Sequence, residues 1–297
     1  MPSRIFRRLA CSLVLGSTLL SAMSATLAQS TQPTQPTQPA AQATDQIVWG
    51  KYNVPPYMIR SGEFAHQGIF DLTLDVIKKG LPQYQHVELE APFPRINNEI
   101  RKGSHWCYNG MLKTPEREKV GYLSLPTSIF LPLRIIMRRD RVDQFKGKLS
   151  LQALLQNPQL TTSVMRDRSY SPTVDKLLAA YPPRENYSEQ VESIGMLLAG
   201  RIDYMIELPL LAFEQARVMG QPGALVALPM QEASEVVFNR VMCPRNEWGR
   251  QVVEQVNKVL LAKRAQPAYR AIVEKWHDPE SVAEIDRIYD KVFLKIP

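Results

Sequence analysis

The sequence predicts an α/β protein with two lobes. Short β-branched or aromatic runs alternate with helical patterns along most of the chain, which is the order of a mostly parallel sheet covered by helices. The alternation falls into two sets, and the second set follows the apolar run Leu133–Met137. Because each set is only roughly a hundred residues long, two lobes are favoured over one continuous sheet.

The first 28 residues have the order of a secretory signal peptide. Arg4, Arg7 and Arg8 precede the twelve-residue apolar run Leu9–Leu20, and small residues lead up to Ala28. The run is shorter than the ~17 to 25 residues that a membrane-spanning helix needs. We therefore expect cleavage after Ala28 and a protein that works outside the cytoplasm.

The next segment, residues 29–45, is predicted to be a disordered leader. It repeats Thr-Gln-Pro three times, and residues 29–44 contain no charge and little that could be buried. Such a composition cannot offset the entropy lost on ordering. The folded part is expected to begin near Asp45 and to be long enough for a substantial core.

The charge of the chain does not favour a nucleic-acid partner. The sequence has 36 basic and 29 acidic residues; without the three arginines of the signal peptide, 33 basic residues leave a net charge of about +4. That excess is too small to indicate nucleic-acid binding. The tightest basic group, Arg138, Arg139 and Arg141, is interpreted as a solvated linker.

Two cysteines, Cys107 and Cys243, remain after the signal peptide is removed. In an oxidising compartment such an even pair can form a disulfide. The four histidines show no spacing typical of metal ligands, so neither a metal nor another cofactor is predicted. The sequence also shows no nucleophile with its base and no phosphate-binding glycine loop, so it does not predict an enzyme.

The first set begins with a predicted strand at Ile47–Trp49. A helix follows, because one apolar stripe extends from Phe70 to Leu81 at three- and four-residue spacing. Further strands are predicted at Val87–Leu89 and Trp106–Met111.

The second set also alternates predicted helices and strands. Ser150 can cap a helix, Thr161–Val164 predicts a strand, and Pro172 opens the next helix. A helix through Ile194–Leu198 then precedes a strand at Ile202–Ile206.

The remaining chain predicts one strand and three helices. The strand extends to Met242, and Asn246 caps the first helix. The helices carry apolar stripes within residues 252–260, 269–276 and 282–292. We interpret these helices as cover for a sheet.

Several motifs resemble, in their order, the periplasmic solute-binding proteins of amino-acid ABC transporters, solute-binding family 3. The sharpest is Gly110–Arg117 followed by Leu123–Pro126, which is similar to the Thr-x-x-Arg and Ser-x-Pro signature of that family. The weaker similarities are Val48–Gly50 with Pro55–Tyr57, Gly68–Leu72, Phe93–Gly103 and Leu198–Asp203. Together they cover the chain from Gln46 to about His277.

This resemblance implies the type II periplasmic binding protein fold, in which two α/β lobes are joined by a two-strand hinge. The first lobe would comprise residues 46–138 and 238–297, and the second lobe residues 139–237. A small polar solute that bears a carboxylate would lie in the cleft between them, and a hinge motion would close it. The family further implies a periplasmic monomer whose partner is an ABC permease or a membrane sensor.

The resemblance also implies a pairing for the two cysteines. In the family's topology, the returning strand that ends near Met242 lies beside the strand Trp106–Met111. Cys107 and Cys243 are then expected to form a disulfide within the first lobe.

In the first lobe, the family's arginine that fixes the ligand's α-carboxylate corresponds to Arg117. A planar guanidinium suits this role because it can donate two parallel hydrogen bonds to a carboxylate; the alternative is a surface arginine paired with a neighbouring glutamate. The other candidates in this lobe, some of which could equally be core residues, are Thr114, Gly110, Met111, Phe93 and Tyr57.

In the second lobe, we expect ligand contacts from Arg168, Ser169 and Ser171. These residues lead into a predicted helix, and the free amides at a helix start favour an anion. Ser171 could equally serve only as the cap of that helix.

Two departures from the family pattern concern the ligand's amino group. Leu112 stands where amino-acid binders usually have a serine or threonine, and Leu208 occupies part of the place of their acidic residue. Glu207 is the candidate substitute for that acid. A standard α-amino acid ligand is thereby put in doubt, and another small anion or a peptide-like molecule remains open.

Two other functions are compatible with the resemblance. A periplasmic enzyme similar to cyclohexadienyl dehydratase would need an acid beside the leaving hydroxyl, for which Glu207 and Glu99 are the candidates. An orphan binding protein that reports its ligand to a receptor would use the same cleft. Delivery of a solute to a transporter is favoured over the enzyme because no paired-acid motif stands out, whereas the sequence does not separate delivery from the sensing role.

Overall fold

The computed structural model describes residues 45–145, 149–183, 185–187, 190–232 and 235–296, which belong to one compact unit. The expected signal peptide, residues 1–28, and the expected leader up to residue 44 lie outside these residues. Among the residues that are described, no helix is long and apolar enough to cross a membrane.

The first lobe is built on a five-stranded sheet with the order β2-β1-β3-β10-β4. Its strands are β1 (Gln46–Lys51), β2 (Gln85–Glu90), β3 (Trp106–Leu112), β4 (Gly121–Phe130) and β10 (Val237–Pro244). β1 is parallel to β2 and β3, whereas β10 is antiparallel to β3 and β4. Two distant segments of the chain therefore share one sheet.

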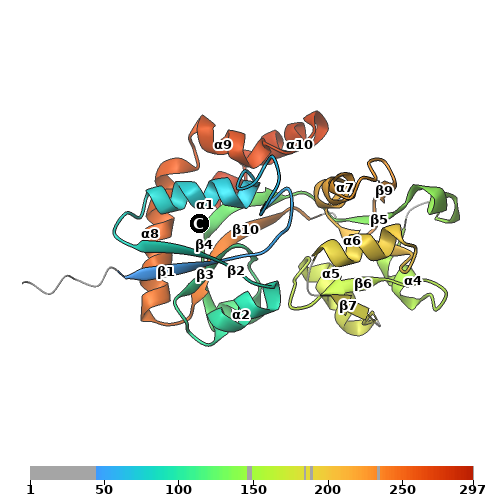
Figure 1. Cartoon of the computed structure of the whole chain (residues 1–297), viewed down its shortest axis with the longest axis horizontal. Helices are drawn as coiled ribbons and strands as arrows, with labels where there is room; N and C mark the ends of the chain where they lie inside the picture. The colour runs from blue at the N-terminus through green and yellow to red at the C-terminus, as the bar shows by residue number, and fades with distance from the viewer. Residues whose placement is uncertain (1–44, 146–148, 184, 188–189, 233–234, 297) are drawn as a thin grey trace, which may run out of the picture. The chain divides into compact units, whose positions relative to one another are not determined.

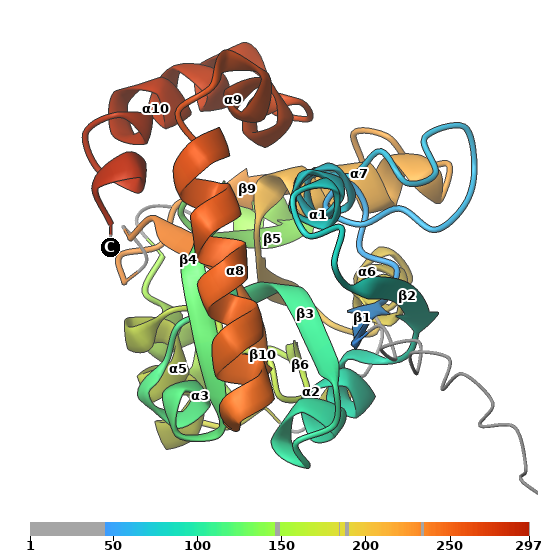
Figure 2. The same ribbon diagram turned by 90° about the vertical axis from the view of Figure 1, so that its left-hand side faces the viewer.

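Helices cover this sheet with apolar stripes. They are α1 (Ile69–Lys79), α2 (Phe93–Arg101), α3 (Pro115–Val120), α8 (Glu247–Lys263), α9 (Pro267–Glu274), α10 (Pro279–Tyr289) and the 3-10 turn η2 (Phe293–Lys295). α8 lies across β4 and β10, as Figure 2 shows. Val252, Val256 and Leu260 of α8 are fully buried in one cluster with Leu74 and Ile77 of α1, so the expected covering role is confirmed for α8.

The second lobe contains two smaller sheets. β5 (Arg134–Arg138) lies between β8 (Tyr204–Glu207) and β9 (Leu225–Leu228), and all pairings are antiparallel. β6 (Ser163–Met165) pairs in parallel with β7 (Glu185–Tyr187). The helices are α4 (Leu151–Gln156), α5 (Pro172–Ala180), α6 (Gln190–Leu198), α7 (Pro209–Val218) and the 3-10 turn η1 (Arg139–Gln144). Figure 1 shows α6 and α7 beside β5, which both helices contact.

The strand β5 corrects one expected boundary. The first lobe was expected to extend to residue 138, but Arg134–Arg138 pairs on both sides with strands of the second lobe. The chain therefore crosses between the lobes after β4 and again between β9 and β10. These crossings start from neighbouring strands, because Phe130 of β4 pairs with Val237 of β10.

Local sequence signals set several helix starts. The side chains of Ser150, Ser171 and Asn246 accept hydrogen bonds from backbone amides in the first turns of α4, α5 and α8, as predicted. α7 was not predicted. It begins with Pro209 at its first position, and its apolar residues form no clear single stripe.

The expected disulfide is present between Cys107 of β3 and Cys243 of β10. The register pairs Tyr108 with Met242, so the two cysteines face each other one step further along adjacent antiparallel strands. Their Cα atoms are 4.4 Å apart, both residues are fully buried, and the bond spans 136 positions of the sequence. It therefore links the two segments that build the first lobe.

We expect reduction of this disulfide to lower the stability of the first lobe. In the chain-entropy model, cross-linking a loop of this length is worth roughly 5 kcal/mol. Urea unfolding of the Cys107→Ala/Cys243→Ala variant should therefore show a markedly lower midpoint than the wild type. Free-thiol titration of the denatured, unreduced wild type should find no thiol, and two reactive thiols there would contradict the bond.

Candidate ligand-binding cleft

The two lobes meet around a small inner cavity of about 40 Å³. Its walls come from both lobes, and they consist of Tyr52, Val54, Tyr57, Phe70, Phe93, Tyr108, Gly110, Leu112, Arg117, Phe130, Arg168, Ser169 and Leu211. An outer cavity of about 210 Å³ shares Leu112 and Ser169 with it and adds Thr114, Ser171 and Arg240. The inner cavity holds no more than a few waters, so a larger occupant requires the lobes to part.

Arg117 lies at the junction of the lobes. Thr114 caps the short helix α3 by accepting a hydrogen bond from the Arg117 amide at 3.2 Å. The guanidinium donates from Nη1 to the Leu112 carbonyl at 3.0 Å and from Nη2 to the Asp167 carbonyl at 3.1 Å. One side chain of the first lobe thus contacts the backbone of both lobes.

The charge of Arg117 is buried without an acidic partner. The residue is only 7% exposed, and no ion pair to it occurs within the described parts of the chain. Burial lowers the pKa of Arg117 to about 10. The alternative of a surface arginine is therefore wrong: Glu118 pairs instead with Lys113 at 3.0 Å.

Six aromatic rings form most of the inner wall. Tyr57, which was expected here, has its ring centroid 4.8 Å from that of Phe130 and 5.1 Å from that of Phe70. Phe93, also expected, lies 5.5 Å from Tyr52 and 5.6 Å from Tyr108. The rings of Tyr52, Phe70, Tyr108 and Phe130 were not predicted.

The alternation of β3 explains which of its residues reach the cavity. Tyr108, Gly110 and Leu112 line it, whereas Met111, a predicted contact, does not. Successive side chains of a strand point to opposite faces, so Gly110 and Met111 cannot share a wall. Gly110 has φ 141°, and a Cβ there would lie 2.7 Å from both the Phe70 ring and the Tyr108 hydroxyl, so only glycine lets these rings close over the strand.

A buried ion pair holds the loop that carries Tyr57. The carboxylate of Asp71 accepts hydrogen bonds from the amides of Ile59 at 2.9 Å and Gly68 at 3.1 Å. Lys51 lies 2.6 Å from the same carboxylate, and both side chains are buried. Although burial alone would lower it, Asp71 and then Glu88 raise the pKa of Lys51 above its usual value. Asp71 therefore holds the loop that places Tyr57 at the cavity.

Arg168 and Glu207 form a buried ion pair. Glu207, at the end of β8, is fully buried and accepts from Nη2 of Arg168 at 2.6 Å and also from Nη1. It further accepts from the Leu208 amide at 2.8 Å. Burial alone would lower the pKa of Arg168, but Glu207 raises it well above its usual value. Only Arg168 reaches the cavity, because Glu207 lies behind the wall.

The two candidate serines are already engaged in local contacts. Ser169 donates to the Asp175 carboxylate and lines both cavities. Ser171 caps α5, accepting from the Val174 amide at 3.3 Å, and lines the outer cavity with Thr114. The acid candidate Glu99 lies outside both cavities, where it accepts from Ser104 at 2.9 Å.

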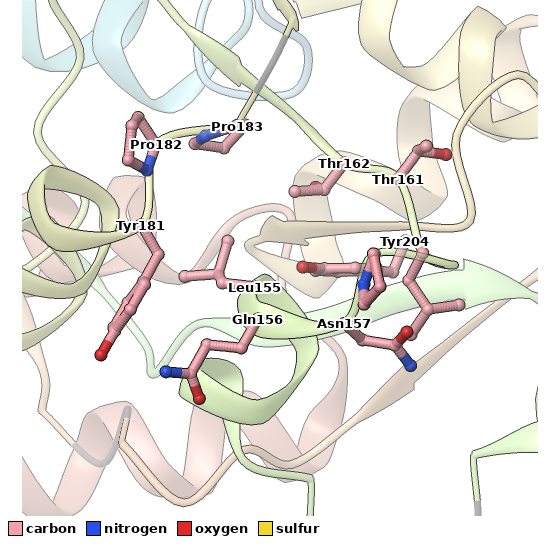
Figure 3. Close-up of a pocket in the computed structure, with 11 residues that line it drawn as sticks. Leu155, Gln156, Asn157, Thr161, Thr162, Tyr181, Pro182, Pro183 and Tyr204 are labelled. Atoms are coloured by element: carbon pink, nitrogen blue, oxygen red, sulfur yellow. The ribbon is translucent and has the colours of Figure 1, made fainter.

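Larger cavities lie elsewhere in the described structure. Figure 3 shows one of about 390 Å³ within the second lobe, lined by residues such as Gln156, Thr162 and Tyr204. No charged side chain lines it among the described residues, so it offers no anchor for a charged solute. Another, of about 570 Å³, lies beside α7 and the start of α10, where Glu214 pairs with Arg217 at 2.7 Å and Asp278 caps the helix.

The comparisons with known proteins establish the fold. No family model and no curated protein matches the sequence. A histidine kinase sensor domain with similarity to periplasmic binding proteins matches with TM-score 0.64 and 16% identity over 78% of this chain and 96% of that chain. The substrate-binding protein of an amino acid ABC transporter matches with TM-score 0.62 and 18% identity over 78% and 99% of the two chains.

A third similar structure is an amino acid ABC transporter substrate-binding protein from Streptococcus pneumoniae bound to L-arginine. It matches with TM-score 0.62 and 16% identity over 78% of this chain and 93% of that chain. The chain has the type II periplasmic binding protein fold that these structures share. The expected fold class is thereby confirmed.

We expect Glu207→Gln to destabilise the second lobe, because it leaves the buried guanidinium of Arg168 without its carboxylate. Breaking a buried pair from one side typically costs about 3–5 kcal/mol. The double variant Arg168→Met/Glu207→Gln, which removes the charge altogether, should recover much of this loss in urea unfolding. Equal losses in the single and double variants would show that the pair's electrostatics are not responsible.

Stability should also fall with pH through His277, which lies before α10. Burial lowers the pKa of His277 to about 4, and its Nε2 has no hydrogen-bond partner in the described structure. The unfolded state, with a pKa of about 6.5, then binds more protons between these values. This contribution, about 3 kcal/mol, is present above pH 6.5 and lost as the pH falls towards 4. Urea unfolding across this range should show a weaker pH dependence for His277→Asn, and an unchanged slope would contradict the assignment.

Proposed function

We propose that the chain is a periplasmic solute-binding protein that captures a small carboxylate-bearing solute between its lobes and delivers it to an ABC-type permease. The observation that carries the proposal is Arg117, a buried cation whose guanidinium donates hydrogen bonds in the described structure only to the Leu112 and Asp167 carbonyls. Two of its five donors are used in this way, which leaves donors for a carboxylate.

The position of Arg117 in the sheet supports this role. It follows the carboxyl end of β3, and ligands of open α/β sheets are held at that edge. Parting the lobes would separate Arg117 from the Asp167 carbonyl. A ligand carboxylate could then take the place of this neutral acceptor with a stronger, charge-assisted bond.

Several features together support the proposed compartment and partner. A leader with the order of a signal peptide, a disulfide and the absence of a membrane-spanning helix among the described residues all support a periplasmic protein. The similar structure of an amino acid ABC transporter's substrate-binding protein supports delivery to a permease. The similar histidine kinase sensor domain supports the second candidate, a sensor that uses the same cleft.

The dehydratase alternative lacks support in the cleft. Glu207 accepts hydrogen bonds from Arg168 with both carboxylate oxygens, and it does not line the cavity. Glu99 lies on α2, outside the cavity. Neither acid is placed to donate a proton to a bound ring.

We expect Arg117→Ala to abolish most of the affinity for the solute. A thermal-shift screen of small carboxylates first identifies a solute, since a ligand at 100 times its dissociation constant stabilises by about 2.7 kcal/mol. Calorimetric titration should then show a loss of roughly 2–5 kcal/mol for Arg117→Ala and a smaller loss for Arg117→Lys, whose ammonium lacks the planar fork.

The matched control is Lys119→Ala, which removes a positive charge from an exposed residue of the same helix. It should bind like the wild type. Equal affinities of Arg117→Ala and Lys119→Ala would remove Arg117 from the site. Mass analysis of the recovered solute completes the test, because a chemically altered solute would indicate an enzyme.

A further inference from the structure

The charges at the inner cavity restrict what it can hold. Among the described residues, Arg117 and Arg168 are the only charged side chains in its walls, and both are cationic. Glu207 neutralises Arg168 from behind through two hydrogen bonds. Asp175, which does not line the inner cavity, supports the charge of Arg117 from outside that wall, so the positive charge that meets a ligand in the inner cavity is that of Arg117.

The same arrangement disfavours a ligand with an ammonium group. Such a group needs a carboxylate in the wall, and none lines the inner cavity within the described chain. Glu207, the candidate for this task, is 0% exposed and already accepts from Arg168 and from the Leu208 amide. An ammonium in the cavity would therefore lie close to cations without a partner.

The rest of the wall favours a flat, apolar body. Six aromatic rings surround the cavity, with neighbouring centroids separated by distances such as 4.8 Å for Tyr57 and Phe130 and 5.9 Å for Phe70 and Phe130. Val54, Leu112 and Leu211 add apolar side chains to the same wall. Ring faces and edges pack well against another ring.

From these contacts we infer that the cleft selects an aromatic monocarboxylate that lacks an ammonium group, with its carboxylate on Arg117 and its ring among the six aromatic side chains. The inference rests on the proposed function, because it assigns the class of solute held at the same cleft. The Arg168–Glu207 pair is assigned the role of excluding amino acids.

Entry of such a solute requires the lobes to part. The inner cavity of about 40 Å³ has no room for a ring. The outer cavity of about 210 Å³ shares Leu112 and Ser169 with the inner one, so a modest opening would join the two. Parting the lobes would also break the hydrogen bond from Arg117 to the Asp167 carbonyl.

Four related probes test the inference by calorimetric titration of the mature wild type. They are 3-phenylpropanoate, L-phenylalanine, 2-phenylethylamine and propanoate, which vary the carboxylate, the ammonium and the ring one at a time. We expect 3-phenylpropanoate to bind about 30-fold or more tighter than L-phenylalanine, because like charges brought together at an interface are strongly disfavoured. Propanoate should bind weakly and 2-phenylethylamine should not bind.

A pair of variants tests the excluding role of Arg168 directly. Arg168→Gln removes the cation that balances the charge of Glu207, so the preference should move towards L-phenylalanine. Arg168→Gln/Glu207→Gln removes the acid as well and should keep the wild-type preference. Circular dichroism confirms that each variant is folded; if Arg168→Gln is unfolded alone, its refolding by L-phenylalanine but not by 3-phenylpropanoate is the expected result.

The outcomes separate the inference from the proposed function. Tighter binding of L-phenylalanine than of 3-phenylpropanoate to the wild type, lost in Arg117→Ala, would overturn the inference and keep the carboxylate-binding function. Binding of none of the four probes would also overturn the inference, while the broader carboxylate screen decides the function. Binding of 3-phenylpropanoate that is unchanged in Arg117→Ala would overturn both.

Discussion

The antiparallel pairing of β10 with β3 and β4 is the constraint on which the rest of the structure depends. It brings a segment that follows the second lobe back into the first sheet and places Cys243 opposite Cys107. It also sets Val237 beside Phe130, so both crossings between the lobes start from neighbouring strands. Because the crossings are adjacent, the lobes can rotate about them while each keeps its own sheet.

The two lobes differ in whether the buried charge at the cleft has an ion-pair partner, and this difference sets the chemistry of the cleft. In the second lobe, Arg168 and Glu207 offset each other's desolvation within one wall. In the first lobe, the guanidinium of Arg117 donates hydrogen bonds only to carbonyl groups among the described residues, and the charge of Asp175 acts on it without forming an ion pair. The cleft therefore combines a neutral wall with a cationic one, and this asymmetry gives the site a preferred sign of ligand charge.

Much of the fold could be predicted from local signals, but tertiary pairing could not. The caps at Ser150, Ser171 and Asn246 and the stripe of α1 are properties of short windows. The lobe boundary was misplaced because β5 is an apolar strand whose partners, β8 and β9, are far along the chain. An apolar run by itself does not say which sheet it joins.

The site shows the same limit at the level of single residues. Arg117 was recognised because its motif is contiguous, whereas Arg168 and Glu207 are separated by 39 positions and nothing local indicates that they pair. Phe70 and Phe130 reach one cavity from a helix and a distant strand, which no periodicity within either element reveals. The alternation of β3 was the one available signal, and it would have favoured Tyr108 over Met111.

The unbalanced charge of Arg117 also bears on how the lobes close. Its lowered pKa, about 10, reflects a cation that burial penalises and that the charge of Asp175 only partly compensates. A lowering of this size corresponds to about 3 kcal/mol between the charged and neutral forms. An anion bound at Arg117 would remove that penalty in the closed arrangement and gain little in the open one, where water already solvates the guanidinium. A ligand shifts an equilibrium only by its difference in affinity for the two states, so the ligand's negative charge is itself a driving force for closure.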